Sequence, residues 1–114
     1  MKRSPIATRS RKKARELQAY SAWRFGARWR RPNCEFPLGC DRGRLDWTVQ
    51  HMWKRSQGAP QIPESEEAWM PLCLTHHMWV EDHPLDAEAL GCRVRAGEGR
   101  DGLPAAASLR AVLR

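Results

Sequence analysis

The chain has 114 residues, 41% of them hydrophobic, and a formal net charge of +7 at pH 7. A chain of this length forms one domain with a modest apolar core, so it needs a further source of stability. It contains no apolar run that fits a signal peptide or a membrane span, which argues against a membrane partner and predicts a cytoplasmic location with reduced thiols.

Positive charge is concentrated near the amino terminus. Residues 1–31 contain eleven Lys and Arg residues and a single acid, Glu16, which gives +10, whereas the remaining residues carry −3. Nucleic-acid phosphates are the default partner of such a basic block, because released counterions favour binding. A solubilising tail is the alternative. The candidate DNA-binding residues of this arm are Arg9, Arg11, Lys12, Lys13, Arg24, Arg28, Arg30 and Arg31.

The same arm predicts one helix over residues 8–30, because Thr8 or Ser10 can cap it, good helix formers dominate its first half and Pro32 ends it. A thin apolar stripe recurs at spacings of three and four and can dock on the rest of the protein. Its members are Leu17, Tyr20, Trp23 and Ala27. Gly26 weakens the second half, so the sequence allows a break there.

The remaining elements are short. We expect a knuckle over residues 33–43, with a turn at 41–43. A strand over residues 45–52 then leads into His51, and a basic loop follows over residues 54–60. An apolar run over residues 69–72 ends at Cys73. Thr75 is a candidate cap for a helix over residues 76–82, and Pro84 opens a second helix that Gly91 ends. Residues 92–95 predict a final strand, followed by a loose tail.

Two close ligand pairs predict a structural zinc site. Cys34-x5-Cys40 and Cys73-x2-His76 offer three thiolates and an imidazole, the ligand types of tetrahedral structural zinc. Cys92 in place of His76 would give four thiolates. We prefer His76, because Cys92 begins an apolar segment where a buried free thiol is the commoner finding.

A second set of residues fits catalysis. His77 and Glu81 share a helix face at i and i+4 and can hold a divalent ion with open coordination positions. His51 can accept a proton from an attacking water. A packed or hydrogen-bonded histidine and a surface His–Glu pair are the alternative interpretations.

Taken in order, these segments resemble the HNH endonucleases of the ββα-metal, or treble-clef, fold, especially the small bacteriophage members. The resemblance spans roughly residues 34–95. Its motifs are the Cys34 to Cys40 knuckle, Gln50-His51, the basic loop 55–60, residues 68–72, Cys73-x2-His76-His77 and the stretch 79–84, followed by a closing helix at 86–91. The resemblance implies a zinc-stabilised α+β domain over residues 32–97. With the features derived above, we expect a basic arm with its helix over residues 1–31 before this domain and a tail over residues 98–114 after it.

Three positions depart from the family pattern. Gln50 stands where the family has a metal-binding His or Asp, and Ala68 where it has the Asn that orients the loop bearing the base. Glu81 replaces a helix His, which hard cations tolerate because a carboxylate is a good ligand for them.

The resemblance implies a metal-dependent DNA endonuclease or nickase that hydrolyses phosphodiester bonds. It implies that His51 is the general base and that His77, Glu81 and Gln50 surround a catalytic Mg²⁺ or Mn²⁺. It also implies a structural Zn²⁺. Double-stranded DNA would be bound by the arm together with Lys54 and Arg55. A role in phage genome processing or packaging follows, in the host cytoplasm and with terminase as a candidate partner. The alternatives are a catalytically degenerate zinc module that binds nucleic acid or protein, and a structural component of a larger particle.

Overall fold

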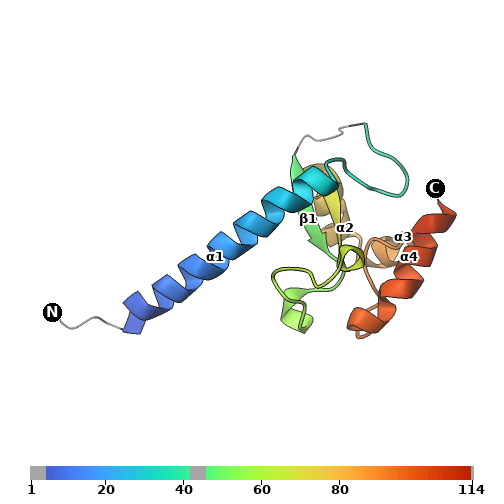
Figure 1. Ribbon diagram of the computed structural model, residues 1–114. Helices are drawn as coiled ribbons and strands as arrows, with labels where there is room; N and C mark the ends of the chain where they lie inside the picture. The colour runs from blue at the N-terminus through green and yellow to red at the C-terminus, as the bar shows by residue number, and fades with distance from the viewer. Residues whose placement is uncertain (1–4, 42–45, 114) are drawn as a thin grey trace.

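The protein combines helices with one two-stranded sheet. The computed structural model describes residues 5–41 and 46–113, with the backbone alone for residues 5–9. The main elements are α1 (Pro5–Arg30), β1 (Trp47–His51), β2 (Trp69–Cys73), α2 (Leu74–Asp82), α3 (Pro84–Leu90) and α4 (Leu103–Val112). Figure 1 shows α1 projecting from a body formed by all the other elements. The expected α+β class is confirmed.

Within the described ranges, no helix is both long enough and apolar enough to cross a bilayer. The predicted turn at residues 41–43 extends outside the described residues.

The sheet is an antiparallel pair whose register places two functional segments at opposite ends. Trp47 pairs with Cys73 at one end and His51 pairs with Trp69 at the other. Every residue of β2 is buried, because β2 is covered on both faces. One face contributes Met70 and Leu72 to a core that includes residues of α2, α3 and α4. From Cys73 the chain turns directly into α2, which packs back against the hairpin in strand–strand–helix order.

Helix α1 is continuous through Gly26 and begins at Pro5, earlier than the predicted cap, because proline suits a first helical turn. Only its carboxyl half contacts the body. Ala27 is fully buried, and the ring of Trp23 meets that of Trp69 edge to face at 5.2 Å between centroids. Leu17 is 49% exposed, so the predicted stripe docks only in its second half.

Arg31, just beyond α1, joins the helix to the sheet. Its guanidinium donates two hydrogen bonds to the Glu35 carboxylate, at 2.9 and 2.7 Å, and one to the Glu66 carbonyl at 2.6 Å. The same group lies 4.3 Å from the ring centroid of Trp69. The Arg31 carbonyl accepts a hydrogen bond from the indole N–H of Trp47 at 2.8 Å. Planar, charge-assisted contacts of this kind are the stronger class of hydrogen bond.

The prediction of a loose tail after residue 97 is wrong. A 3₁₀ turn over Gly99–Gly102 leads into α4, and Leu103 and Ala106 of that helix are buried in the core. Gly91 allows the close approach of α4 to α3, since a Cβ there would lie 2.3 Å from the Ala106 carbonyl oxygen. Residues 103–112 are rich in Ala and Leu, which favour a helix, and the Gly-rich sequence before them does not prevent this helix from forming.

Residues 92–95 do not form the predicted strand. Val94 donates one backbone hydrogen bond to Met52, which anchors the segment beside the end of β1 without extending the sheet.

We expect Arg31→Lys to lower the free energy of unfolding by about 1–3 kcal/mol, because an ammonium cannot make the paired contacts to Glu35 or stack on Trp69. The exposed Arg28→Lys variant is the matched control and should stay within about 0.5 kcal/mol of the parent. Urea denaturation of both variants checks this, and equal stabilities would contradict the role given to Arg31.

Candidate functional site

The four predicted zinc ligands meet where the knuckle, β2 and α2 join. The knuckle is held by two backbone hydrogen bonds: Glu35 donates to Pro71 of β2, and Gly39 donates to Phe36. Gly39 has φ +96°, a conformation that favours glycine at this turn. Cys73 ends β2, and its sulfur accepts the backbone N–H of His76, so this residue caps α2 in place of the predicted Thr75.

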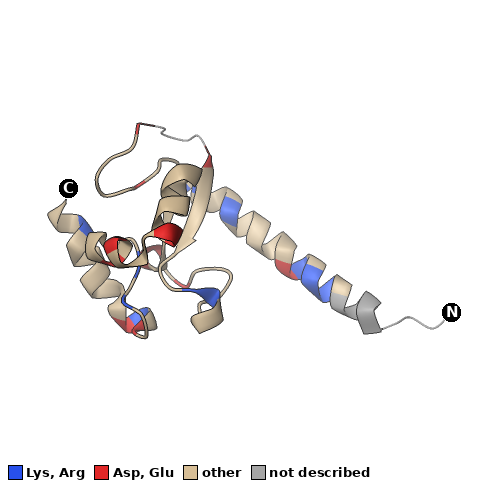
Figure 2. Ribbon diagram, turned by 180° about the vertical axis from the view of Figure 1, so that it is seen from behind, with Lys and Arg blue, Asp and Glu red and all other residues tan. Residues whose placement is uncertain are grey.

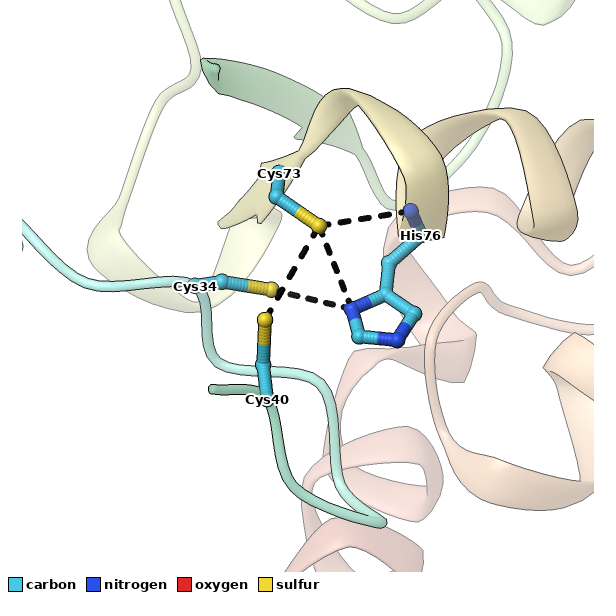
Figure 3. A group of neighbouring side chains, drawn as sticks. All are labelled: Cys34, Cys40, Cys73 and His76. Carbon is cyan, nitrogen blue, oxygen red and sulfur yellow. Dashed lines mark hydrogen bonds between the residues drawn. The ribbon is translucent and has the colours of Figure 1, made fainter. Parts of the chain in front are cut away.

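The four ligand atoms, which we call the CCCH cluster (Cys34, Cys40, Cys73 and His76), all lie within 4.8 Å of one another. Figure 3 shows their side chains converging. His76 Nδ1 lies 3.4 and 3.3 Å from the sulfurs of Cys34 and Cys73, and the sulfurs of Cys40 and Cys73 are 3.9 Å apart. A tetrahedral zinc with ordinary bond lengths separates N from S by about 3.5 Å and S from S by about 3.8 Å. The cluster therefore fits a metal such as zinc.

The alternative ligand Cys92 lies elsewhere. It is fully buried in the apolar core with Leu72 and Val80, and burial raises the pKa of its thiol to about 11. Burial also raises the pKa of Cys34, to about 12, with Cys40 and Cys73 adding to the increase. Three thiols at such close range favour a bound cation that would stabilise them as thiolates.

A pocket of about 370 Å³ lies beside the sheet, and the predicted catalytic residues line it. Those residues are Gln50, His51, His77 and Glu81, and the basic residues Lys54 and Arg55 of the following loop line it as well. They come from β1, from α2 and from the loop after β1.

The half-buried His51 ring is oriented by a main-chain group. Its Nε2 lies 3.0 Å from the carbonyl oxygen of Gln61. A carbonyl only accepts hydrogen bonds, so Nε2 carries the proton and Nδ1 of a neutral ring is left as the basic nitrogen. The tautomer of His51 is thus fixed by Gln61.

A hydrogen-bond relay orients His77. The Thr48 hydroxyl donates to the Leu72 carbonyl at 2.7 Å, and its oxygen lies 2.7 Å from His77 Nδ1. Because the single hydroxyl proton is used, Nδ1 must donate and Nε2 of a neutral ring has a free lone pair. Burial lowers the pKa of His77, while Glu81 raises it and His51 lowers it further. A histidine whose second nitrogen is held in this way is a favourable metal ligand.

Two side-chain oxygens, from Glu81 and Gln50, belong to residues that line the pocket with His77. Nε2 of His77 lies 3.8 Å from Oε1 of Glu81. Two ligand atoms of one ion with bonds of about 2.1 Å can be at most about 4.2 Å apart, so both can reach the same cation. The side-chain amide of Gln50 donates to the His51 carbonyl at 2.9 Å, while its oxygen is buried and has no hydrogen-bond partner among the described residues. An unpartnered buried oxygen favours a bound cation or water.

The candidate DNA-binding residues fall into two groups. Arg24, Arg30 and Arg31 make contacts within the protein: Arg24 with the carbonyl and ring of Trp47, Arg30 with Glu66, and Arg31 as described above. The remaining described members, all exposed, are Arg11, Lys12, Lys13, Arg28, Lys54 and Arg55. Figure 2 shows basic segments along α1 and on the loop after β1. The side chain of Arg9 lies outside the described part.

Sequence patterns could not reveal the groups that orient the two histidines. Gln61 acts through its backbone carbonyl, which every residue has, and it lies ten positions after His51. Thr48 carries a weak signal, because strand alternation places it on the same face as Gln50.

No protein-family model matches this chain, and searches of curated proteins and of solved structures give no significant match.

We expect Cys40→Ser to lose the metal of the CCCH cluster and to unfold the knuckle, because structural zinc contributes directly to folding. Cys92→Ala is the matched control and should retain the metal, since its sulfur lies outside the cluster. Native mass spectrometry and circular dichroism of the zinc-loaded proteins check this. Equal metal retention in both variants would contradict the assignment.

We expect Thr48→Val to change the tautomer of neutral His77, since valine cannot accept the Nδ1 proton, whereas Thr48→Ser should preserve it. Long-range ¹H–¹⁵N NMR of the histidine rings measures this without added divalent cation. The Mn²⁺ affinity of the valine variant should fall about tenfold or more. Identical ring spectra in the two variants would rule out the relay.

Proposed function

We propose that the protein is a zinc-stabilised, metal-dependent DNA endonuclease or nickase of HNH type, with a ββα-metal (treble-clef) fold. The proposal is based mainly on the pocket lined by His51, His77, Glu81 and Gln50. His77 follows His76 of the CCCH cluster directly in α2, so the pocket and the cluster are neighbours. The strand–strand–helix order of β1, β2 and α2 supports the fold assignment.

His51 is the general base in the proposed reaction. Its Nδ1 takes a proton from water while Nε2 stays hydrogen-bonded to the Gln61 carbonyl, and the water attacks the phosphorus. The bond between phosphorus and the 3′ oxygen breaks as the new bond forms, and the departing 3′ oxygen takes a proton from solvent. His77, Glu81 and Gln50 would hold a divalent ion, Mg²⁺ or Mn²⁺, which would supply charge stabilisation at the scissile phosphate and the departing oxygen. The exposed Lys54 and Arg55 at the pocket contact flanking phosphates of double-stranded DNA.

Cys34, Cys40, Cys73 and His76 would hold the structural Zn²⁺ and keep α2 in place against the hairpin. The exposed cations in the first half of α1, Arg11, Lys12 and Lys13, extend the phosphate contacts. The family resemblance extends the proposal to phage genome processing or packaging in the host cytoplasm, with terminase as the candidate partner.

A catalytically degenerate zinc module that binds nucleic acid or a protein is the second candidate. Gln50 and Ala68 favour it: Gln50 offers a neutral oxygen where a charged ligand would bind more strongly, and the buried Ala68 has no polar side chain to orient a neighbour. The Gln61 carbonyl performs the orienting task for His51, which favours the enzyme.

A plasmid-nicking assay separates the two candidates. We expect the zinc-loaded protein to nick supercoiled DNA with Mg²⁺ or Mn²⁺, and His51→Ala to reduce the rate by about 100-fold or more because the base is lost. His77→Ala should lose activity through weaker ion binding.

His83→Ala is the matched control, because His83 is exposed and contacts the Trp79 carbonyl at the end of α2. It should retain the parent rate. No nicking with either metal, or a rate that neither His51→Ala nor His77→Ala lowers, would favour the degenerate module.

A further inference from the structure

The outward face of α1 carries an aromatic surface that the proposed reaction does not use. Phe25 and Trp29 are 70% and 75% exposed, although both are large apolar residues. Their rings lie 6.4 Å apart, edge to face, and together with Arg28 and Pro32 they line a shallow pocket of about 310 Å³. Exposed aromatic rings gathered in this way mark a binding surface.

Helical spacing aligns this surface with free positive charge. Arg11, Arg15, Gln18, Ala22, Phe25 and Trp29 follow one another at alternating steps of four and three, so they share one face of α1. All six are exposed. Arg15 and Phe25 are ten residues apart, or about 15 Å along the helix axis.

Electrostatics on this face favours an anionic partner. Glu16 is the single acid of α1, and it lies eleven residues, or three turns, before the buried Ala27, on the inner face. Arg11, Arg15 and Arg28 have no ion pair with another described residue, unlike Arg30 and Arg31. The outward face therefore combines unpaired cations with open aromatic rings.

We propose that this face binds single-stranded DNA, with bases stacked on Trp29 and Phe25 and phosphates contacted by Arg28, Arg15 and Arg11. This inference rests on the proposed DNA function and adds a substrate feature, an unpaired segment beside the duplex that is cut. Cationic tracks with aromatic rings are the common means of holding unpaired strands, because every base has a face that can stack. The bases of duplex DNA are already stacked on one another and cannot use these rings.

The test measures binding by full-length protein carrying His51→Ala, so that the DNA stays intact. The probes are a fluorescent oligothymidylate of about twenty nucleotides and a fluorescent duplex of the same length. Binding of each probe is measured by fluorescence anisotropy. Adding Phe25→Ala and Trp29→Ala should weaken oligothymidylate binding about tenfold for each ring removed, and duplex binding less than about threefold. Trp29→Phe should keep most of the affinity because it retains a ring face.

Leu17→Ala is the matched control, since it removes an exposed apolar side chain from another face of the same helix. It should leave both affinities unchanged, and circular dichroism should show the same helix content in all variants. Unchanged oligothymidylate binding in the double variant would overturn the inference. So would equal loss for single-stranded and duplex probes, or a dimer in sedimentation that the double variant abolishes, because a second copy would then cover the face.

Failure of this inference and failure of the proposed enzyme give different results. Nicking of duplex plasmid does not depend on Phe25 or Trp29, and oligothymidylate binding does not depend on His51. Loss of stacking with nicking intact therefore rejects this surface alone.

Discussion

The tie between the knuckle and the end of the sheet is the constraint on which the candidate site depends. Cys73 is the last residue of β2, a member of the CCCH cluster and the cap of α2. One residue therefore ends the strand, offers a sulfur to the cluster and begins the helix. Successive residues of a helix point about 100° apart. His76 can therefore face the knuckle while His77 faces Thr48 of β1. The two adjacent histidines serve different sites because the cluster sets where α2 begins.

Apart from Arg28, which is exposed near the carboxyl end, the described positive charge of the amino-terminal arm divides by position along α1. Near the carboxyl end, Arg24, Arg30 and Arg31 bind carbonyls, carboxylates and indole rings of the body, and so attach the helix. Nearer the amino terminus, the exposed cations have no such contacts among the described residues. Net charge alone does not distinguish these groups. A helix anchored at one end and charged at the other extends a small body's reach along a polyanion.

Much of this arrangement could be predicted from the sequence, because its signals are local. Paired ligands at Cys34, Cys40, Cys73 and His76 indicated the cluster, and the i, i+4 spacing indicated that His77 and Glu81 share a face. The missed features are non-local or carry no residue signature. Gln61 acts through a carbonyl, and Arg31 joins three segments that only the fold brings together. Helix α4 was missed because a glycine-rich stretch precedes it, and because its apolar residues are buried only where α3 and the core pack against them.

We propose that His77, Glu81 and Gln50 hold one divalent cation in the pocket that His51 also lines, apart from the metal of the CCCH cluster. Titration of the zinc-loaded protein with Mn²⁺, followed by paramagnetic broadening of assigned NMR signals, tests it most directly. We expect selective broadening of the signals of these four residues at low Mn²⁺, with those of Phe36 and Cys92 broadened far less. Uniform broadening, or broadening centred on the CCCH cluster alone, would contradict it.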